Sequence, residues 1–472
     1  MNIFRRAAAV LACLAIVVAS PHGSVASAGG PPIGTSAAAP EGTRYMHRDL
    51  SSTDAVPWAG PNAAGRVASS IPGGTCSTVF QASDGMVLGL CTRYVGTNQG
   101  PNGSFGLNLV VPSVMLFDPK TAQPLATLEL KKTSLLGGVY GFMDEHDRVV
   151  MPEGRDIVHI GHRFDGKRWV LSVDKRTALN LPAGTSLGGL SPDGQGRTWF
   201  VTQDSQVGLV DGRKVIKQPL AGVPGREHIA NGLTGRPHGV SVLTTHALYE
   251  VVYRGGKIVV EWRKPYDRGS GRKPGQLSWG SGTTPTFFGP NSKWVAIVDN
   301  ADNSPNLMVM DAKTGKDVCR MPAFERVGKG TENSLLAHGN TLWIPSTYGF
   351  SYPPFAVDGP QKPMFAQFNG GLSKVDVVER GGSVSCERRW ENHTRIETLP
   401  TLTLKDRRIW ALSTRPGSLS VDLIGVDADS GREVARRPLG TLPFDRPMQL
   451  TGMITPDGAY WQGTLSRMIK LK

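Results

Sequence analysis

The chain has 472 residues, of which 39% are hydrophobic and 19% are charged, and it contains 58 glycines and 34 prolines. This balance excludes a coiled coil and a largely disordered polypeptide. This number of turn-forming residues favours short strands over helices. The composition therefore allows one large all-β domain or several smaller domains. The net charge is +13, but no run of five basic residues occurs, and the sequence therefore predicts no nucleic-acid partner.

The N-terminus has the pattern of an export signal. Arg5 and Arg6 precede an apolar run at residues 7–19, and small residues at 26–28 would allow cleavage before Gly29. We expect residues 1–28 to be a signal peptide, with the general secretory and twin-arginine routes both open. Residues 29–43 read as a flexible leader. No later apolar stretch reaches the ~18 residues of a transmembrane helix, so we expect a monomeric protein without a membrane span, secreted to the extracellular space or cell envelope.

Four cysteines remain after such processing, which fits an oxidising compartment. Cys76 and Cys91 flank a segment that resembles one β-hairpin, so a bridge between its two strands is reasonable. By exclusion, Cys319 would pair with Cys386. These two cysteines occupy equivalent outer-strand positions of different repeats, so the distance between them is the open question.

A repeated pattern is the main signal in the chain. In each copy small and hydroxyl residues lead into an apolar strand, and a polar turn and a second strand follow. The eight copies are residues 75–91, 137–152, 187–202, 230–251, 282–299, 331–345, 399–413 and 450–465. Their spacing is typical of propeller blades. Five tryptophans share the strand after the turn, where we expect them to pack between neighbouring sheets: Trp199, Trp294, Trp343, Trp410 and Trp461.

A second hairpin follows several copies, so each blade would have four strands. It contains a strand, an Asp and a tight turn, best seen at residues 114–122, 307–315 and 423–431. We therefore predict that residues 44–472 form a single eight-bladed β-propeller of four-stranded antiparallel blades. The last copy lacks room for a fourth strand, so we expect an N-terminal strand at about residues 44–58 to complete it.

The strand-Asp-x-x-Thr-Gly turn resembles the repeat of the quinoprotein-type (PQQ-like) β-propellers, most closely at residues 311–315 and next at 427–431. In that family a tryptophan commonly follows the turn and docks against the neighbouring blade. Here Cys319 and Ala435 stand near that place, whereas Trp169, Trp262 and Trp390 lie on the corresponding strands of other blades. The resemblance covers the chain from about residue 60 and implies the fold.

Candidate binding residues precede the first strand of each copy, because in a propeller these segments form one mouth of the axial channel. They are Tyr140, Asn231, Thr283, Thr284, Glu332, Asn333 and Thr401. Glu332, Asn333 and Asn231 would offer oxygen ligands to calcium, and a second oxygen-rich loop contains Asp299 and Asp302. The alternative for both groups is that the side chains satisfy neighbouring backbone groups.

Three functions remain open on this basis. The first is an exported propeller that binds a small molecule, a glycan or an extracellular protein at its mouth, with no catalysis assigned. The second is a quinone-dependent oxidoreductase, which would need a stacking platform and calcium beside an acidic base. The third is a calcium-dependent hydrolase, lyase or lactonase. Glu145, Glu227 and Glu332 are carboxylates that could converge for sugar hydrolysis. Apart from candidate calcium ligands, the residues identify no cofactor.

Overall fold

The computed structural model describes residues 41–472 except 100–104, 132–138, 221, 223–226 and 230–231. These residues belong to the compact unit Ser36–Lys472. The expected signal peptide, nearly all of the leader and Asn231 lie outside the described residues. Within the described part, strands alternate with turns, two 3-10 helices (Pro290–Ser292 and Pro354–Ala356) are present, and no helix is long and apolar enough to cross a membrane.

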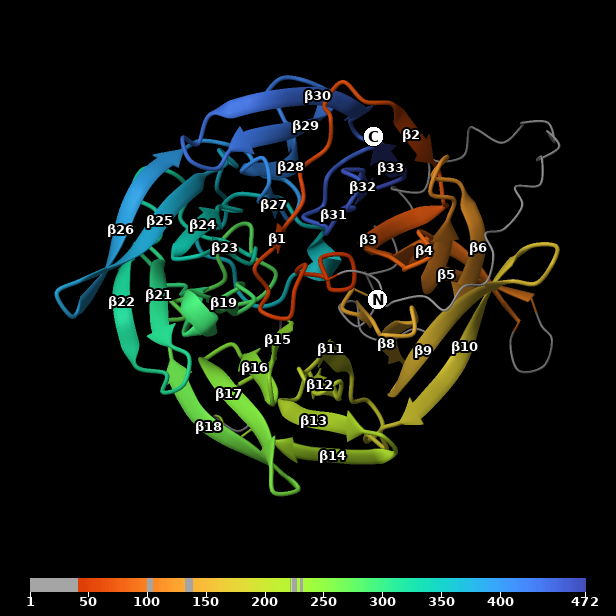
Figure 1. Cartoon of the computed structure of the whole chain (residues 1–472), viewed down its shortest axis with the longest axis horizontal. Helices are drawn as coiled ribbons and strands as arrows, with labels where there is room; N and C mark the ends of the chain where they lie inside the picture. The colour runs from red at the N-terminus through yellow and green to blue at the C-terminus, as the bar shows by residue number, and fades with distance from the viewer. Residues whose placement is uncertain (1–40, 100–104, 132–138, 221, 223–226, 230–231) are drawn as a thin grey trace. The chain divides into compact units, whose positions relative to one another are not determined.

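Eight four-stranded antiparallel blades surround one axis, which confirms the predicted fold (Figure 1). Blades 1 and 2 are β3 (Gly74–Gln81), β4 (Val87–Gln99), β5 (Phe105–Phe117), β6 (Pro124–Glu129), then β7 (Phe142–Met143), β8 (Val149–Glu153), β9 (Asp156–Phe164) and β10 (Trp169–Ala178). Blades 3 and 4 are β11 (Leu187–Pro192), β12 (Thr198–Thr202), β13 (Gln206–Asp211), β14 (Lys214–Pro219), then β15 (Leu233–Arg236), β16 (Gly239–Leu243), β17 (Ala247–Arg254) and β18 (Lys257–Pro265).

The remaining blades follow the same order from the axis outward. Blades 5 and 6 are β19 (Thr286–Phe288), β20 (Trp294–Val298), β21 (Asn306–Asp311), β22 (Asp317–Pro322), then β23 (Leu336–His338), β24 (Thr341–Pro345), β25 (Leu372–Arg380) and β26 (Ser383–Asn392). Blade 7 is β27 (Thr401–Thr403), β28 (Arg408–Thr414), β29 (Ser420–Asp427) and β30 (Glu433–Thr441). Blade 8 is β31 (Met453–Ile454), β32 (Tyr460–Gly463), β33 (Met468–Leu471) and β2 (Val67–Ser70).

An N-terminal strand closes the last blade, as expected, but it is not the predicted segment. The closing strand is β2, which pairs with β33 from Val67↔Leu471 to Ser70↔Met468. Residues 44–58 were expected at this place, and that expectation was wrong. They cannot serve as an outer strand because His47, Arg48 and Asp54 are buried at the axis. A strand from the beginning of the described chain and the last strand, β33, therefore pair within one blade.

The five tryptophans of the repeat fill the space between blades, as predicted. Trp199, Trp294, Trp343, Trp410 and Trp461 are at most 3% exposed and lie in apolar clusters that join neighbouring sheets. Burial of such a ring removes a large apolar area from water and stabilises the contact between blades. The core of the protein is therefore a ring of inter-blade clusters.

Two outer-strand tryptophans dock on the turn of the next blade. Trp262 of β18 donates to the carbonyl of Ala312, and Trp390 of β26 donates to the carbonyl of Asp429. The rings cover Gly315 and Gly431, where a Cβ atom would lie 2.7 and 2.8 Å from a ring carbon. Both glycines also have positive φ, so the Thr-Gly or Ser-Gly turn and the docked ring require glycine together.

Both predicted disulfides are present. Cys76 and Cys91 lie opposite each other in β3 and β4 of blade 1. Cys319 in β22 and Cys386 in β26 join the outer strands of blades 5 and 6, with their Cα atoms 5.7 Å apart. Neighbouring outer strands are therefore close enough for a bridge, which settles the question that the repeat pattern left open.

Residues 43–58, which we call the plug, cross one end of the axial channel. Their hydrogen bonds reach the innermost strands of blades 1, 2, 4, 5, 6, 7 and 8, at Gln81, Met143, Thr234, Phe287, Ala337, Leu402 and Ile454. Within the plug, β1 (Ala55–Val56) pairs in parallel with β27. Figure 1 shows β1 close to the axis. The end of the channel where the innermost strands finish is the plug face, and the opposite end is the mouth face.

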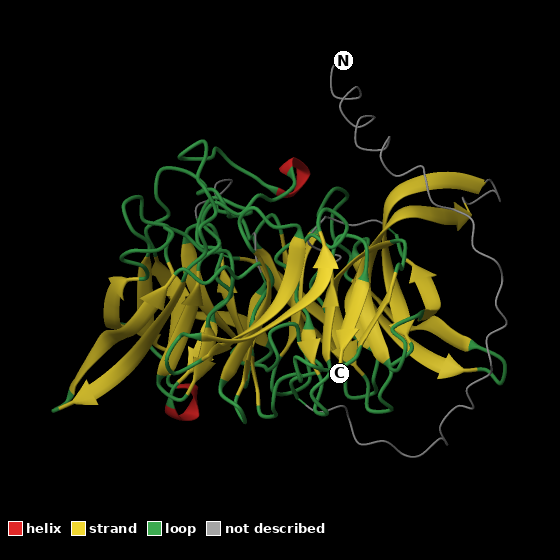
Figure 2. Ribbon diagram, turned by 90° about the horizontal axis from the view of Figure 1, so that it is seen from above, coloured by secondary structure: helices red, strands yellow, loops and turns green. Residues whose placement is uncertain are grey.

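Loops extend from both ends of the blades (Figure 2), and the two 3-10 helices lie at opposite ends. Pro290–Ser292 follows the innermost strand β19 and belongs to the plug face. Pro354–Ala356 lies in the long connection between β24 and β25 and belongs to the mouth face. Apart from Asn231, which lies outside the described residues, the candidate binding residues precede or begin the innermost strands and therefore lie toward the mouth face.

Candidate functional site

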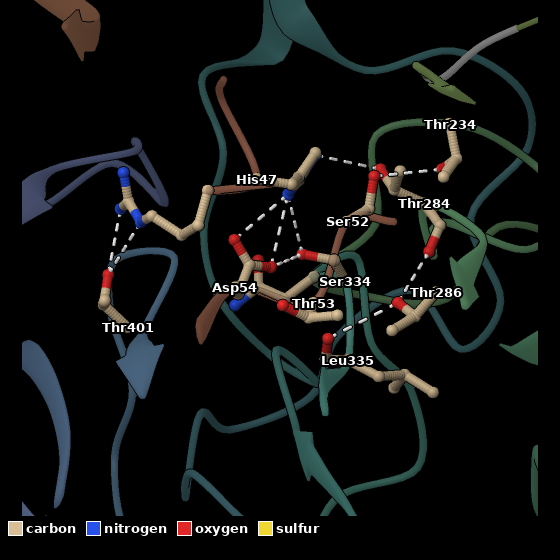
Figure 3. Close-up of polar contacts among 12 residues, drawn as sticks. His47, Ser52, Thr53, Asp54, Thr234, Thr284, Thr286, Ser334, Leu335 and Thr401 are labelled. Atoms are coloured by element: carbon tan, nitrogen blue, oxygen red, sulfur yellow. Dashed lines mark hydrogen bonds and ion pairs between the residues drawn. The ribbon is translucent and has the colours of Figure 1, made fainter. Parts of the chain in front are cut away.

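The plug is anchored by a buried histidine (Figure 3). Nδ1 of His47 lies 3.2 Å from Oδ2 of Asp54 and 3.1 Å from Oγ of Ser334. Its Nε2 lies 3.2 Å from Oγ1 of Thr284. The hydroxyl of Ser334 also donates to Asp54. One imidazole therefore joins two parts of the plug to blades 5 and 6.

Arg48 makes the corresponding contacts with blades 7 and 8. Its Nη2 donates to Oγ1 of Thr401 at 2.9 Å and to the carbonyl of Gly452 at 2.6 Å. The side chain is fully buried, and burial lowers the pKa of its guanidinium. Asp54 is the nearby negative charge that opposes this shift. A buried cation held by neutral acceptors is costly to leave unpaired, so these contacts fix the plug firmly.

Thr284 and Thr401, two of the predicted binding residues, are thus bonded to the protein's own plug. Thr283 is also satisfied internally, since its hydroxyl contacts Ser281 and the carbonyl of Val298. The hydroxyls near the plug are therefore engaged in holding the fold together. Binding capacity for another molecule has to be sought nearer to the mouth.

Glu332 and Asn333 lie at that level, immediately before β23. Oε2 of Glu332 accepts from the backbone amide of Leu277 at 3.1 Å, whereas its Oε1 is buried without a hydrogen-bond partner. Nδ2 of Asn333 donates to Oε1 of Gln449 at 3.0 Å, and its Oδ1 is buried and unpartnered. Asn333 therefore connects blade 6 to the loop that enters blade 8. Two adjacent residues present unused oxygens.

Further unpartnered polar atoms lie on the loops that hold this pair. Oγ1 of Thr451, two residues after Gln449, is buried without a partner. The same is true of Oγ of Ser278, which follows Leu277, and of Nε of Arg272, whose positive charge acts on Glu332. Leaving such groups unsatisfied costs about 1–3 kcal/mol each, so this arrangement is one that a bound polar molecule or water would complete. We call Tyr140, Arg272, Ser278, Glu332, Asn333, Tyr352, Gln449 and Thr451 the mouth cluster.

Burial controls the charge of the mouth cluster. It raises the pKa of Glu332 to about 8, against the opposing effects of the Leu277 amide and Arg272. Glu332 is therefore mainly protonated at neutral pH. Burial and the proximity of Glu332 also raise the pKa of Tyr140 and of Tyr352 well above the usual range. The cluster thus presents neutral hydroxyl, carboxyl and amide groups, together with the guanidinium of Arg272.

The second predicted metal loop is satisfied by the protein itself. Asp299 accepts from the backbone and side chain of Asn306 and pairs with Arg320. Oδ1 of Asp302 accepts from the backbone amide and hydroxyl of Ser270. Within the described residues, no three His, Cys, Asp or Glu side chains gather as a metal site would require. The calcium prediction rests on Glu332 and Asn333, with Asn231 outside the described part.

The three glutamates suggested for sugar hydrolysis have different surroundings. Glu145 follows β7 on the plug face, is exposed, and pairs with His146. Glu227 accepts from Tyr249 and Thr244 and pairs with Arg263. Glu332 alone belongs to the mouth cluster. Glu145 follows the innermost strand β7 on the plug face, whereas Glu332 precedes the innermost strand β23 on the mouth face, so the structure does not bring all three together.

Several residues of the site were not identified from the sequence. His47, Arg48 and Asp54 come from a segment assigned to an outer strand. Gln449 and Tyr352 lie in connections without a motif, and Thr451 lies in the eighth repeat copy but was not selected. The segment around His47 and Arg48 lacks the alternating pattern of a strand, which argues against an outer strand but does not indicate a segment that crosses the channel. No linear signal marks Tyr352, because its place depends on how the connection between β24 and β25 folds back.

The protein is an eight-bladed β-propeller, and its blades resemble those of quinoproteins. The structure is similar to the quinohemoprotein alcohol dehydrogenase of Comamonas testosteroni, with a TM-score of 0.55, 9% identity, and coverage of 92% of this chain and 81% of that one. The quinohemoprotein alcohol dehydrogenase ADHIIG of Pseudomonas putida HK5 gives a TM-score of 0.52, 10% identity, and coverage of 92% and 80%. At these identities the likeness concerns the fold alone.

By sequence, the chain is similar to an uncharacterized protein of Archaeoglobus fulgidus, with 21% identity over 331 residues. The match covers 63% of this chain and 64% of the relative, which is less than two thirds of its length. No family model matches the chain. The particular family therefore stays open, and the propeller class is what the comparisons support.

Quinoproteins of this fold would hold a quinone cofactor together with a calcium ion. The described residues of this protein do not fit such a site. The mouth cluster contains one carboxyl group, Glu332, which burial keeps protonated near neutral pH. The tryptophans of the repeat are buried between blades. Trp279, next to Ser278, donates to the carbonyls of Arg268 and Gly269, and Arg268 covers its ring. A calcium ion beside a quinone needs several oxygen ligands, some of them charged. We therefore derive no redox step from this site.

Proposed function

We propose that the protein is an exported β-propeller that binds a small, neutral, hydroxyl-bearing molecule at the mouth cluster. The observation that carries the proposal is the pair of buried, unpartnered oxygens, Oε1 of Glu332 and Oδ1 of Asn333. They belong to neighbouring residues at the start of an innermost strand. Export is supported by the two disulfides and by the expected signal peptide.

The chemistry of the mouth cluster favours a neutral ligand over an anion or a metal ion. A protonated Glu332 can both donate and accept a hydrogen bond, Asn333 offers an acceptor, and Thr451 offers a hydroxyl. Tyr140 and Tyr352 contribute rings with polar ends. A sugar or polyol has alternating donors and acceptors on a partly apolar frame, and it would satisfy such a set. A divalent cation would first have to displace the proton of Glu332.

The test is calorimetric titration of the purified protein with glucose, N-acetylglucosamine, inositol and calcium chloride, preceded by native mass spectrometry for a retained ligand. We expect a sugar or polyol to bind and Thr451→Val to weaken that binding by about tenfold, the loss of one hydrogen bond. Thr451→Val has the shape of threonine, and its Oγ1 has no partner to lose. Ser70→Ala is the matched control, because Oγ of Ser70 is also buried and unpartnered but lies on the outermost strand.

Two outcomes would contradict the proposal. In one, native mass spectrometry gives the bare polypeptide mass and none of the four probes binds. In the other, Ser70→Ala weakens binding as much as Thr451→Val does. Tight calcium binding that depends on Glu332 would favour the metal site predicted from the sequence instead.

A further inference from the structure

The most exposed large apolar side chains all lie on the mouth face. Among the described residues they are Met364 (89% exposed), Phe365 (81%), Ile71 (75%), Leu419 (67%) and Phe444 (65%). Each lies in a connection at the mouth end of the blades. These connections are residues 71–73, 346–371, 415–419 and 442–452. Single exposed apolar residues are ordinary on protein surfaces. Their concentration on one face is what calls for an explanation.

Hydrogen bonds join these four connections into one sector. The amide of Leu442 donates to the carbonyl of Leu419 at 2.8 Å. Arg446 donates to the carbonyl of Ser351 at 3.3 Å, and its own carbonyl accepts from Leu465. Leu465 in turn accepts from Thr75 of β3, next to the segment 71–73. These loops therefore belong to blades 6, 7, 8 and 1. The tip with Met364 and Phe365 also borders the connection that enters blade 5, where the amide of Lys362 donates to the carbonyl of Arg272 at 2.8 Å.

The exposed charges of these four connections are mainly positive. Lys362, Arg415 and Arg446 are exposed, and Asp358 is the one exposed acid among them. The other acid, Asp445, is fully buried and paired with Arg467. A positively charged rim around apolar tips attracts negatively charged surfaces, and the excess of Lys and Arg over Asp and Glu in the whole chain acts in the same direction.

The tips are also stiffened by proline. Pro72 follows Ile71, Pro363 precedes Met364, and Pro443 precedes Phe444. Proline restricts the backbone before any partner is met, so less conformational entropy is lost when the tip is immobilised. Separate, stiff apolar tips can insert into the irregular boundary of a lipid layer. A protein partner would need a continuous, closely packed contact surface, which separate tips do not offer.

We propose that this sector of the mouth face docks the protein on a bilayer that contains anionic lipids. The apolar tips would enter the headgroup and acyl boundary, and Lys362, Arg415 and Arg446 would contact lipid phosphates. The proposal is independent of the ligand at the mouth cluster, although docking would turn the mouth toward the membrane. It involves no membrane span.

Co-sedimentation with vesicles tests this proposal directly. The protein is mixed with vesicles of phosphatidylcholine alone or with 30% phosphatidylglycerol (about one lipid in three), at low and at high salt. We expect binding to the anionic vesicles and its loss at high salt. The double variant Met364→Ser/Phe365→Ser should reduce the bound fraction by at least about fivefold, because it removes the two largest apolar tips.

The matched control is Phe164→Ser/Val434→Ser. These residues are 41% and 47% exposed and lie at plug-face strand ends, so the variant should keep vesicle binding within about twofold of wild type. Thermal melting of each variant verifies folding. Equal loss in both variants, binding unaffected by Met364→Ser/Phe365→Ser, or no binding to anionic vesicles would overturn the proposal. So would a dimer in solution that the tip variant dissociates, since a second copy would then occupy the sector.

Discussion

Nη2 of Arg48 donates to the hydroxyl of Thr401 across 353 residues of sequence, at a distance of 2.9 Å. This contact joins the start of the folded chain to blade 7, and a second bond from the same nitrogen reaches Gly452 of blade 8. The first folded residues of the chain therefore stabilise the ring from inside, in addition to the strand that closes it from outside.

Substitution of Arg48 by methionine should destabilise the protein by about 2–4 kcal/mol. The change leaves Thr401 and the Gly452 carbonyl without their donor in a buried place. Urea unfolding of the purified protein measures the difference. Arg66→Met is the control, because Arg66 is exposed and should change stability by no more than about 0.5 kcal/mol. Equal stabilities of Arg48→Met and wild type would show that the plug is not anchored as described.

The pH dependence of stability should carry the signature of Glu332. The folded state keeps its proton up to about pH 8, whereas the unfolded chain releases it near 4.5. Between these values the folded state binds more protons, so stability falls as pH rises, by at most about 1.4 kcal/mol per pH unit. Glu332→Gln removes this dependence and should gain stability relative to wild type from pH 5 to 8. A difference that stays constant over this range would contradict the raised pKa.

The docked tryptophans should matter more than their partial exposure suggests. Trp262→Ala removes a ring that covers Gly315 and a hydrogen bond to Ala312, and we expect a loss of about 2–4 kcal/mol. Trp262→Phe should lose less, since it keeps most of the apolar contact. Trp169 contacts His162 and Phe164 of its own blade, so Trp169→Phe is the control. Denaturant unfolding distinguishes these variants, and equal losses for Trp262→Ala and Trp262→Phe would argue against ring docking.

Loss of the bridge between blades 5 and 6 should also lower stability. Cys319 and Cys386 are 67 residues apart in sequence, and closing such a loop in the unfolded chain is worth about 2–4 kcal/mol. Cys319→Ser/Cys386→Ser should therefore unfold at lower urea concentration than wild type. Reduction of wild type breaks both disulfides and should lower the midpoint at least as far. The double serine variant therefore isolates the contribution of the bridge between blades 5 and 6. An unchanged midpoint would show that this bridge does not form.

The repeat was predictable because each blade restates the same physical pattern. The five inter-blade tryptophans, the hairpins and the Asp-containing turns follow local rules of burial and turn chemistry, and these define the eight blades. The plug was not predictable in this way. Its residues are held by contacts with seven blades. The stretch that contains His47, Arg48 and Asp54 has no periodic pattern that would predict a loop crossing the channel.

The candidate site was predictable in part. Glu332 and Asn333 stand where the repeat places the mouth, and the structure shows them with unpartnered oxygens. The roles of Thr284 and Thr401 depended on the plug, and Tyr352 depends on a long connection that folds over the mouth. Such long-range relationships leave no trace in residue spacing, so the sequence alone indicated where a site would lie and could not indicate which groups remain free.

Hydrogen exchange followed by mass spectrometry tests the plug most directly. The amides of Phe287, Ala337 and Leu402 donate to the plug carbonyls of Ser51, Thr53 and Asp54, each at 2.9 Å. Peptides that contain these amides, and the plug itself, should resist exchange in wild type and lose protection in Arg48→Met, while β12 and β20 stay protected. Complete exchange of the plug within seconds in wild type would contradict a plug that is held across this end of the channel by its hydrogen bonds to the innermost strands.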